Sequence, residues 1–231
     1  MKMIGLIGGM SWESTIVYYK LLNRLARQRL GGLHSAKILL WSFDFAEIQA
    51  HQATGDWDAA TNAMVAAARK VEAGGAECIL ICTNTMHRSA GAVQAAIDIP
   101  LLHIADAAAN AIKAAHVKRP LLLATRYTME QDFYNGYLTD QHGISPIVPD
   151  AGGRTIVHDI IFEELCRGVI RPESKARYLE VVSQAEAESI DGIILGCTEI
   201  GLLIGPEDFA LPVFDTTLLH AEAAIDFALA S

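Results

Sequence analysis

The sequence predicts an α/β protein made of two similar domains, each with a mostly parallel sheet. Short apolar runs alternate with helical patterns along the 231 residues, which is the order of elements in parallel sheets. Two of these runs, residues 78–81 and 192–195, stop abruptly at small polar residues. Aligning the two runs places Thr83 at the position of Cys197, so the chain divides into halves of similar design.

The first half begins with an apolar strand expected at residues 3–7, followed by a Gly-rich turn and a helix. Ser11 is a suitable N-cap for this helix, and apolar residues recur at helical spacing until Gly31 and Gly32. Strands are then expected at residues 37–43, 76–82 and 101–104, and helices at residues 56–73 and 87–97. Residues 1–104 therefore form one βα series.

The second half repeats this alternation from residue 105 onward. Helices are expected at residues 105–115, 128–141, 155–167, 172–189 and 218–229, with a short one after Cys197. Strands are expected at residues 120–124, 144–148, 191–196 and 213–214. This alternation indicates parallel strand pairs in the second half as well.

Composition and charge restrict the class of protein. Hydrophobic residues make up 52% of the chain and charged residues 19%, as in compact globular proteins. No apolar run approaches the roughly 18 residues of a membrane span, and the N-terminus lacks a secretion signal. We therefore expect a cytoplasmic protein without a membrane partner. A formal charge of −9 with no Lys/Arg cluster argues against nucleic acid but is compatible with a small anionic substrate.

The chain has four cysteines in no CxxC pair, Cys78, Cys82, Cys166 and Cys197. This spacing argues against a zinc site and a disulfide framework, so we expect free thiols and no metal. The first three are interpreted as core residues, because cysteine is among the most buried residue types. Cys197 differs from them because a hydroxyl and a carboxylate, Thr198 and Glu199, follow it directly.

The Gly-rich turn after the first strand contains Gly8, Gly9 and Met10. Such a turn can bind a phosphate or carboxylate on free backbone N–H groups. It matches neither GxGxxG nor a Walker motif, which disfavours a nucleotide. A tight βα turn without a ligand is the alternative.

Polar residues follow both aligned strands, and ligands bind at the carboxyl edge of parallel sheets. If the two edges face each other across a cleft between the domains, Thr83 and Cys197 lie on opposite sides of a ligand. Inversion of a tetrahedral carbon requires two such groups, one to remove a proton and one to return it from the far side. A thiol at a helix start suits this role because the helix dipole lowers its pKa.

The neighbours of these two residues extend the hypothesis. Thr198 and Glu199 can orient or deprotonate the thiol, and Asn84 and Thr85 can hold a substrate carboxylate or ammonium group. The alternatives are an ordinary buried thiol at Cys197 and residues that only cap a turn or helix near position 83.

Three motifs carry a resemblance to a known family: residues 82–87 (CTNTMH), residues 196–200 (GCTEI) and residues 5–15 (GLIGGMSWEST). Together they resemble the aspartate/glutamate racemases that need no pyridoxal phosphate, over essentially the whole chain. The resemblance implies two Rossmann-like domains, an active site in the cleft between them, no cofactor, an amino-acid substrate and a homodimer. It also implies that the final strand and helix return to the first domain, so that residues 1–104 plus 208–231 form one domain and residues 105–207 the other.

The chain departs from the family pattern at Thr83, because the family has its first catalytic cysteine directly before Asn-Thr. Cys82 cannot replace that cysteine, since adjacent strand residues point to opposite faces. A threonine hydroxyl is a poorer base than a thiol, and in the family the second cysteine acts on the L enantiomer. We therefore predict a racemase that prefers L-aspartate or L-glutamate and is slow with the D forms.

The resemblance further implies a set of substrate contacts. These are the Met10 backbone and the residues Gln52, Asn84, Thr85, Thr125, Thr198 and Glu199. Arg167 is the candidate for the distal carboxylate, because an arginine fork pairs well with a carboxylate, although it could instead complement a helix dipole. Gln52 stands where the family has a basic group, which could broaden the substrate range.

Two other functions fit the same residues. A decarboxylase or isomerase of the same superfamily could use Cys197 alone to protonate one face of an enolate. A non-catalytic two-domain clamp could bind an acidic amino acid without exchanging its α-proton.

Overall fold

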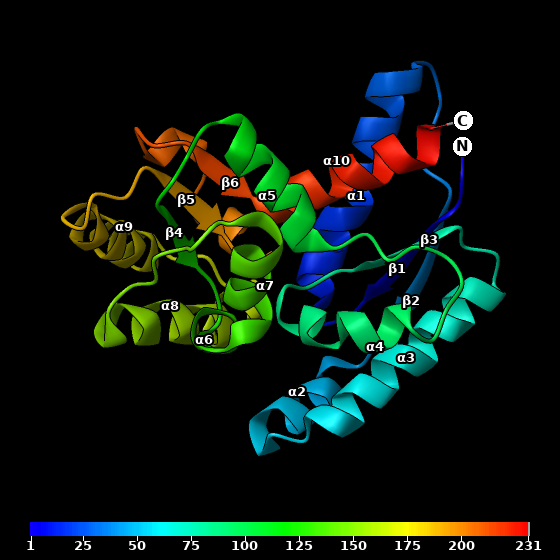
Figure 1. Cartoon of the computed structure of the whole chain (residues 1–231), viewed down its shortest axis with the longest axis horizontal. Coiled ribbons are helices and arrows are strands. Elements are labelled where there is room, and N and C mark those ends of the chain that lie inside the picture. The colour runs from blue at the N-terminus through cyan, green and yellow to red at the C-terminus, as the bar shows by residue number, and fades with distance from the viewer. Residues whose placement is uncertain (231) are drawn as a thin grey trace. The chain divides into compact units, whose positions relative to one another are not determined.

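The computed structural model describes residues 1–230 and confirms the α/β class with two similar parallel sheets. Residue contacts divide the chain into two compact units. Unit 1 comprises Met1–Ile104 and the segment from His220 onward, and unit 2 comprises Ala105–Leu219. Each unit contains one three-stranded sheet with its own helices (Figure 1).

The sheet of unit 1 has the order β2-β1-β3, with all pairs parallel. Its strands are β1 (Ile4–Gly8), β2 (Ile38–Ser42) and β3 (Cys78–Ile81). Every residue of β1 and β3 is buried, since helices cover both faces of the sheet. The apolar runs of these strands are therefore continuous and do not alternate with polar residues.

Two hydrophobic clusters cover the two faces of this sheet. On one face, Ile7, Ile79 and Ile81 pack with the helices α2 (Phe45–Thr54), α3 (Trp57–Ala73) and α4 (Ala90–Gln94). On the other face, Ile4, Leu6 and Leu80 pack with α1 (Trp12–Leu30) and α10 (Thr216–Leu229). Figure 1 shows these two helix layers on opposite sides of the sheet. Odd and even strand residues thus serve different clusters, as the two-residue period of a strand requires.

The sheet of unit 2 has the order β4-β5-β6 and is also parallel. Its strands are β4 (Pro120–Leu123), β5 (Gly192–Leu195) and β6 (Val213–Asp215). The remaining helices of the chain are α5 (Ile104–Ala114), α6 (Arg126–Glu130), α7 (Asp132–His142), α8 (Ala151–Glu163) and α9 (Pro172–Glu186). Short 3-10 segments are η1 (Thr85–Ser89), η2 (Leu165–Arg167), η3 (Ile200–Leu202) and η4 (Pro206–Asp208).

The two sheets have the same topology. In each, the first strand (β1 or β4) pairs with the strand that ends before the aligned motif (β3 or β5). On its other side, that strand pairs with a later segment of the chain. This segment is the single bridge residue Leu101 in unit 1 and β6 in unit 2. In this register Thr83 and Cys197 each lie two residues past the strand end, at equivalent positions of the two units.

Two of the expected strands are only single β-bridges in the structure. Residues 101–104 contribute only the bridge Ile79–Leu101, and residues 144–148 contribute only Leu121–Ile147. Pro100 and Pro146 precede these bridges, and proline cannot donate to a strand ladder. The apolar pattern alone therefore overestimated strand length at both places.

The helices also differ locally from the expectation. The helix expected at residues 128–141 is divided into α6 and α7 at Gln131, which has extended backbone angles. The helix expected at residues 87–97 is replaced by η1 and the short α4. α2 was not expected as a helix, and Asp44 caps it by accepting the Ala46 N–H.

The chain returns to unit 1 later than the resemblance implied, at residue 220 instead of residue 208. The last strand belongs to the second sheet because β6 pairs in parallel with β5. Only α10 from His220 onward lies in unit 1, where its Ala228 carbonyl accepts the Lys2 N–H at 2.9 Å. Across residues 1–230, no helix is both long enough and apolar enough to cross a membrane.

Candidate active site

The Gly-rich turn of unit 1 is closed by its own helix. Gly9 has a positive φ of 84°, and a Cβ at this position would collide with the backbone of Phe43, so only glycine fits. The Gly9 N–H donates to Thr15 Oγ1 at 2.8 Å. The Met10 side chain is buried and belongs to the cluster on the α2/α3 face. The turn therefore has a structural role at Gly9, and any contact of Met10 with a ligand falls to its backbone.

Thr83 lies at the carboxyl edge of the same sheet and is held by His87. The His87 Nδ1 lies 2.8 Å from the Thr83 carbonyl, and Nε2 lies 3.2 Å from the Ile104 N–H. Nδ1 must therefore carry the proton, and Nε2 accepts. Burial, with the neighbouring His103 and His220, holds the pKa of His87 well below its usual range. His87 is thus a neutral residue that fixes the backbone behind Thr83.

Three other predicted site residues of unit 1 lie in this segment or against it. Asn84 and Thr85 follow Thr83 directly and are both buried. Gln52, in the last turn of α2, is buried and donates from Nε2 to Met86 Sδ at 3.4 Å. Gln52 therefore contacts the segment that begins at Thr83, although more than 30 residues separate the two in sequence.

In unit 2, the Glu199 carboxylate accepts hydrogen bonds from three side chains. The Cys197 thiol donates to Oε2 at 3.0 Å, and the Thr198 hydroxyl donates to the same oxygen at 2.7 Å. The Cys166 thiol donates to Oε1 at 3.7 Å. Cys197, Thr198 and Glu199 are buried. The thiol and the carboxylate are therefore close enough for proton transfer and are shielded from water.

The pKa of the Cys197 thiol is raised well above its usual range, first by burial and then by the negative charges near it, chiefly Glu199. The sequence suggested the opposite direction, through a helix dipole. The helical segment that directly follows Cys197 is the three-residue η3, which starts at Ile200, and so short a turn has little macrodipole. The resting residue is a thiol whose proton points at Glu199.

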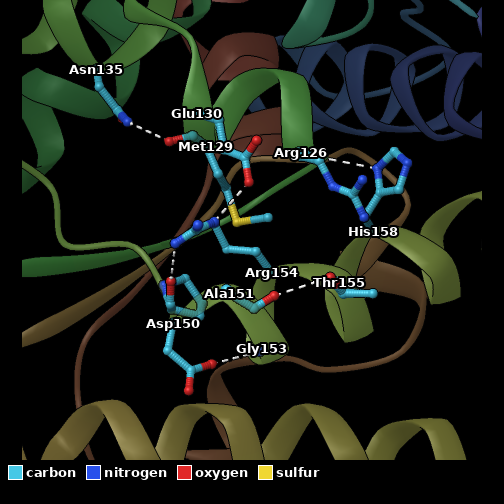
Figure 2. Close-up of polar contacts among 11 residues, drawn as sticks. Arg126, Met129, Glu130, Asn135, Asp150, Ala151, Gly153, Arg154, Thr155 and His158 are labelled. Carbon is cyan, nitrogen blue, oxygen red and sulfur yellow. Dashed lines mark hydrogen bonds and ion pairs between the residues drawn. The ribbon is translucent and has the colours of Figure 1, made fainter.

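Thr125 and Cys197 share one edge of the second sheet. β4 and β5 are neighbours with Leu123 opposite Leu195, and Thr125 and Cys197 each lie two residues further on. Thr125 is buried and occupies the N-cap position of α6, and its Oγ1 lies 3.2 Å from Thr128 Oγ1. The turn after Thr125 is fixed by α8 through hydrogen bonds to His158 and Arg154 (Figure 2).

Arg167, unlike these buried side chains, is exposed. Its side chain is 64% exposed and its guanidinium pairs with Glu163 at 2.9 Å. The adjacent Cys166, expected from its residue type to be a core residue, is only partly buried and contacts Glu199. No sequence signal identifies Cys166, because 33 residues separate it from Glu199. Within residues 1–230, no group of three or more His, Cys, Asp or Glu side chains is arranged to hold a metal ion.

Comparisons with known proteins agree on one family. The family model of Asp/Glu/Hydantoin racemases matches residues 7–224. A solved structure from Yersinia pestis, assigned to the Asp/Glu racemases, has a TM-score of 0.92 and 53% identity and covers 100% of both chains. An aspartate racemase homologue from Pyrococcus horikoshii OT3 has a TM-score of 0.85 and 34% identity, with 99% of each chain covered. The broad specificity amino-acid racemase RacX of Bacillus subtilis is 22% identical over 182 residues, which are 76% of this chain and 75% of RacX.

Proposed function

Because the chain belongs to the Asp/Glu/hydantoin racemase family and is an isomerase, we propose that it racemises L-aspartate and L-glutamate through the proton on the α-carbon. One observation carries the proposed chemistry, namely the 3.0 Å contact between the Cys197 thiol and the Glu199 carboxylate. A buried thiol next to a carboxylate can become a base without exchanging its proton with water.

Abstraction begins with transfer of the thiol proton from Cys197 Sγ to Glu199 Oε2, which leaves a thiolate and a neutral carboxylic acid. The thiolate then removes the α-proton of the L substrate, and the electron pair of the C–H bond moves into the substrate carboxylate. Thr198, which donates to the same oxygen of Glu199, keeps that oxygen oriented while its charge changes. The raised pKa of Cys197 makes the thiolate a strong base once it forms.

Reprotonation on the other face is assigned to Thr83. The Thr83 hydroxyl gives a proton to the α-carbon and becomes an alkoxide, which takes up a proton from water, while Glu199 releases to water the proton that it received from Cys197. Because the hydroxyl is a weak acid, this half of the reaction is the slower one. Racemisation has an equilibrium constant of one, so kcat/KM is equal for the two enantiomers. A preference for the L form must therefore appear as a higher kcat together with a proportionally higher KM.

The substrate is proposed to bind through the Met10 backbone and through Gln52, Asn84, Thr85, Thr125, Thr198 and Glu199. Arg167 is proposed to bind the distal carboxylate. To do so it must leave Glu163, and an exposed ion pair of this kind contributes only about 0–1 kcal/mol. Replacing Glu163 by a substrate carboxylate as the partner of Arg167 thus costs little free energy. A homodimer and a cytoplasmic location stay predictions.

The test is ¹H NMR of L-aspartate or L-glutamate with the protein in D₂O, following loss of the α-proton signal together with optical rotation. We expect both to fall with wild type, neither with Cys197→Ala, and both with Cys78→Ala, which removes a different buried thiol. Arg167→Ala should raise KM for aspartate about tenfold, as for loss of a charge-assisted hydrogen bond.

Two results would contradict the proposal. Exchange that persists in Cys197→Ala would remove the cysteine from the mechanism. Release of CO₂ from a substituted malonate, without exchange of either amino acid, would make the protein a decarboxylase of the same superfamily.

A further inference from the structure

Helix α8 holds the turn that follows Thr125 at both of its ends. His158 Nδ1 lies 3.2 Å from the Arg126 main-chain nitrogen, at the first residue of α6. One helical turn earlier on α8, Arg154 Nε donates to Glu130 Oε1 at 2.8 Å, at the last residue of α6. Figure 2 shows both contacts reaching α6 from the same helix.

The start of α8 is itself fixed, so these two side chains project from a rigid base. Asp150 caps the helix by accepting the Gly153 N–H at 2.7 Å. Arg154 also donates from its guanidinium to the Pro149 carbonyl at 2.9 Å. The position of α8 against α6 therefore does not depend on His158 alone.

The hydrogen bond to Arg126 determines the state of His158. A main-chain N–H can only donate, so Nδ1 must be unprotonated and the imidazole neutral. The ring is held edge-on to Tyr127 at 5.9 Å and tilted against Phe162 at 4.8 Å between centroids. These two aromatic rings fix the direction in which Nδ1 points.

The charged groups that face His158 come from α6 and from α8 itself. Burial and the guanidinium of Arg126 lower the pKa of His158, while Asp159 and Glu130 oppose this shift. His158 is therefore neutral at neutral pH. When it takes up a proton in acid, Nδ1 can no longer accept the Arg126 N–H.

The main-chain N–H of Arg126 has no hydrogen-bond acceptor within α6. The Thr125 carbonyl accepts the N–H groups of Thr128 and Met129, both at 3.0 Å. The first N–H groups of a helix have no partner within it, and His158 supplies one for Arg126. The backbone angles at Thr125 and Arg126 are thus set from outside the turn.

We propose that His158 is a positioning residue for substrate binding, which places Thr125 by accepting the Arg126 main-chain N–H. This inference rests on the proposed function, in which Thr125 contacts the substrate. His158 itself does not touch the substrate and takes no part in proton transfer.

The test compares His158→Asn with His158→Gln. The amide oxygen of asparagine can take the place of Nδ1, whereas that of glutamine lies near the position of Nε2 and cannot reach the Arg126 N–H. We expect His158→Gln to raise KM for L-aspartate about three- to tenfold with little change in kcat, which corresponds to one lost hydrogen bond. His158→Asn should stay close to wild type.

The pH dependence separates positioning from a merely structural role. Because the pKa of His158 is lowered from the usual value of about 6.5, KM of wild type should stay constant from about pH 8 to about pH 6.5 and rise only at lower pH, as His158 takes up a proton. In His158→Asn this rise should be absent, because the amide does not titrate. Equal KM values for the two variants, or a rise with acid that persists in His158→Asn, would overturn the proposal.

Amide hydrogen exchange at Arg126 distinguishes failure of the inference from failure of the proposed function. We expect faster exchange in His158→Gln than in wild type and His158→Asn. Wild type that racemises neither acidic amino acid would overturn the function. Wild type that racemises, with Arg126 exchange unchanged in His158→Gln, would overturn the role of His158 alone.

Discussion

At the scale of single residues, the proposed chemistry depends on where the Cys197 proton goes. The nearest acceptor is Glu199 Oε2, which also accepts from Thr198. With the pKa of the thiol raised by burial, the thiolate forms only if this carboxylate takes the proton. Glutamine has the same shape but cannot accept a proton.

We therefore expect Glu199→Gln to slow α-proton exchange about 10²- to 10⁴-fold, the usual contribution of a positioned acid/base. Cys166→Ala is the control, because it removes a donor to Oε1 and leaves the Cys197 contact in place. The measurement is the rate of deuterium incorporation into L-aspartate. A Glu199→Gln protein that exchanges as fast as wild type would show that another group accepts the thiol proton.

At the scale of elements, the 3-10 segment η1 is held in place by the hydrogen bonds of its own His87, which must stay neutral to make them. His87 bonds the Thr83 carbonyl at one nitrogen and the Ile104 N–H at the other. Its pKa is held well below the ordinary value by burial. In the unfolded chain it titrates near the usual value of about 6.5.

The sign of the resulting pH effect follows from these two states. As pH falls through about 6.5, His87 takes up a proton in the unfolded chain but stays neutral in the folded protein. The free energy of unfolding therefore decreases by up to about 1.4 kcal/mol per pH unit. Urea unfolding should therefore give lower stability at about pH 5 than at about pH 7. His87→Asn should have a shallower pH dependence, and His34→Asn, at an exposed histidine, should match wild type. Equal slopes for all three proteins would remove His87 as the source.

At the scale of the whole molecule, the sequence predicts best what is local. The polar residues after β3 and β5 are read directly from the ends of two apolar runs, and the register of the two sheets makes Thr83 and Cys197 equivalent. The contacts of Glu199 with Cys166 and of Arg126 with His158 join residues more than 30 positions apart. No periodicity or spacing encodes them, because they arise only when helices pack on the sheet.

The pKa of Cys197 is the second kind of property that the sequence does not contain. A thiol followed by helix-forming residues suggests a lowered pKa, yet the segment folds as the short η3 and buries the sulfur beside a carboxylate. Burial depends on the complete fold. The place of Cys197 directly after a strand end was thus predictable, whereas its protonation state was not.

The proposed two-base reaction needs one group from each unit on the same substrate, since Thr83 belongs to unit 1 and Cys197 to unit 2. Thr83→Ala tests this requirement. Cys197 can still remove the α-proton, and once the resulting thiol has exchanged that proton for the deuteron held on Glu199, it can return deuterium to the same face. We therefore expect L-aspartate to gain deuterium while keeping its configuration. Thr83→Ser retains the hydroxyl and should restore the D product.

The measurement combines the α-proton signal with separation of the enantiomers, so exchange and inversion are counted separately. Loss of both in Thr83→Ala would mean that Thr83 binds the substrate and does not transfer the proton. Racemisation at the wild-type rate would place the second proton donor elsewhere. Exchange without inversion is the one result that divides the reaction between the two units as proposed, because only then does each face of the α-carbon have its own proton-transfer group.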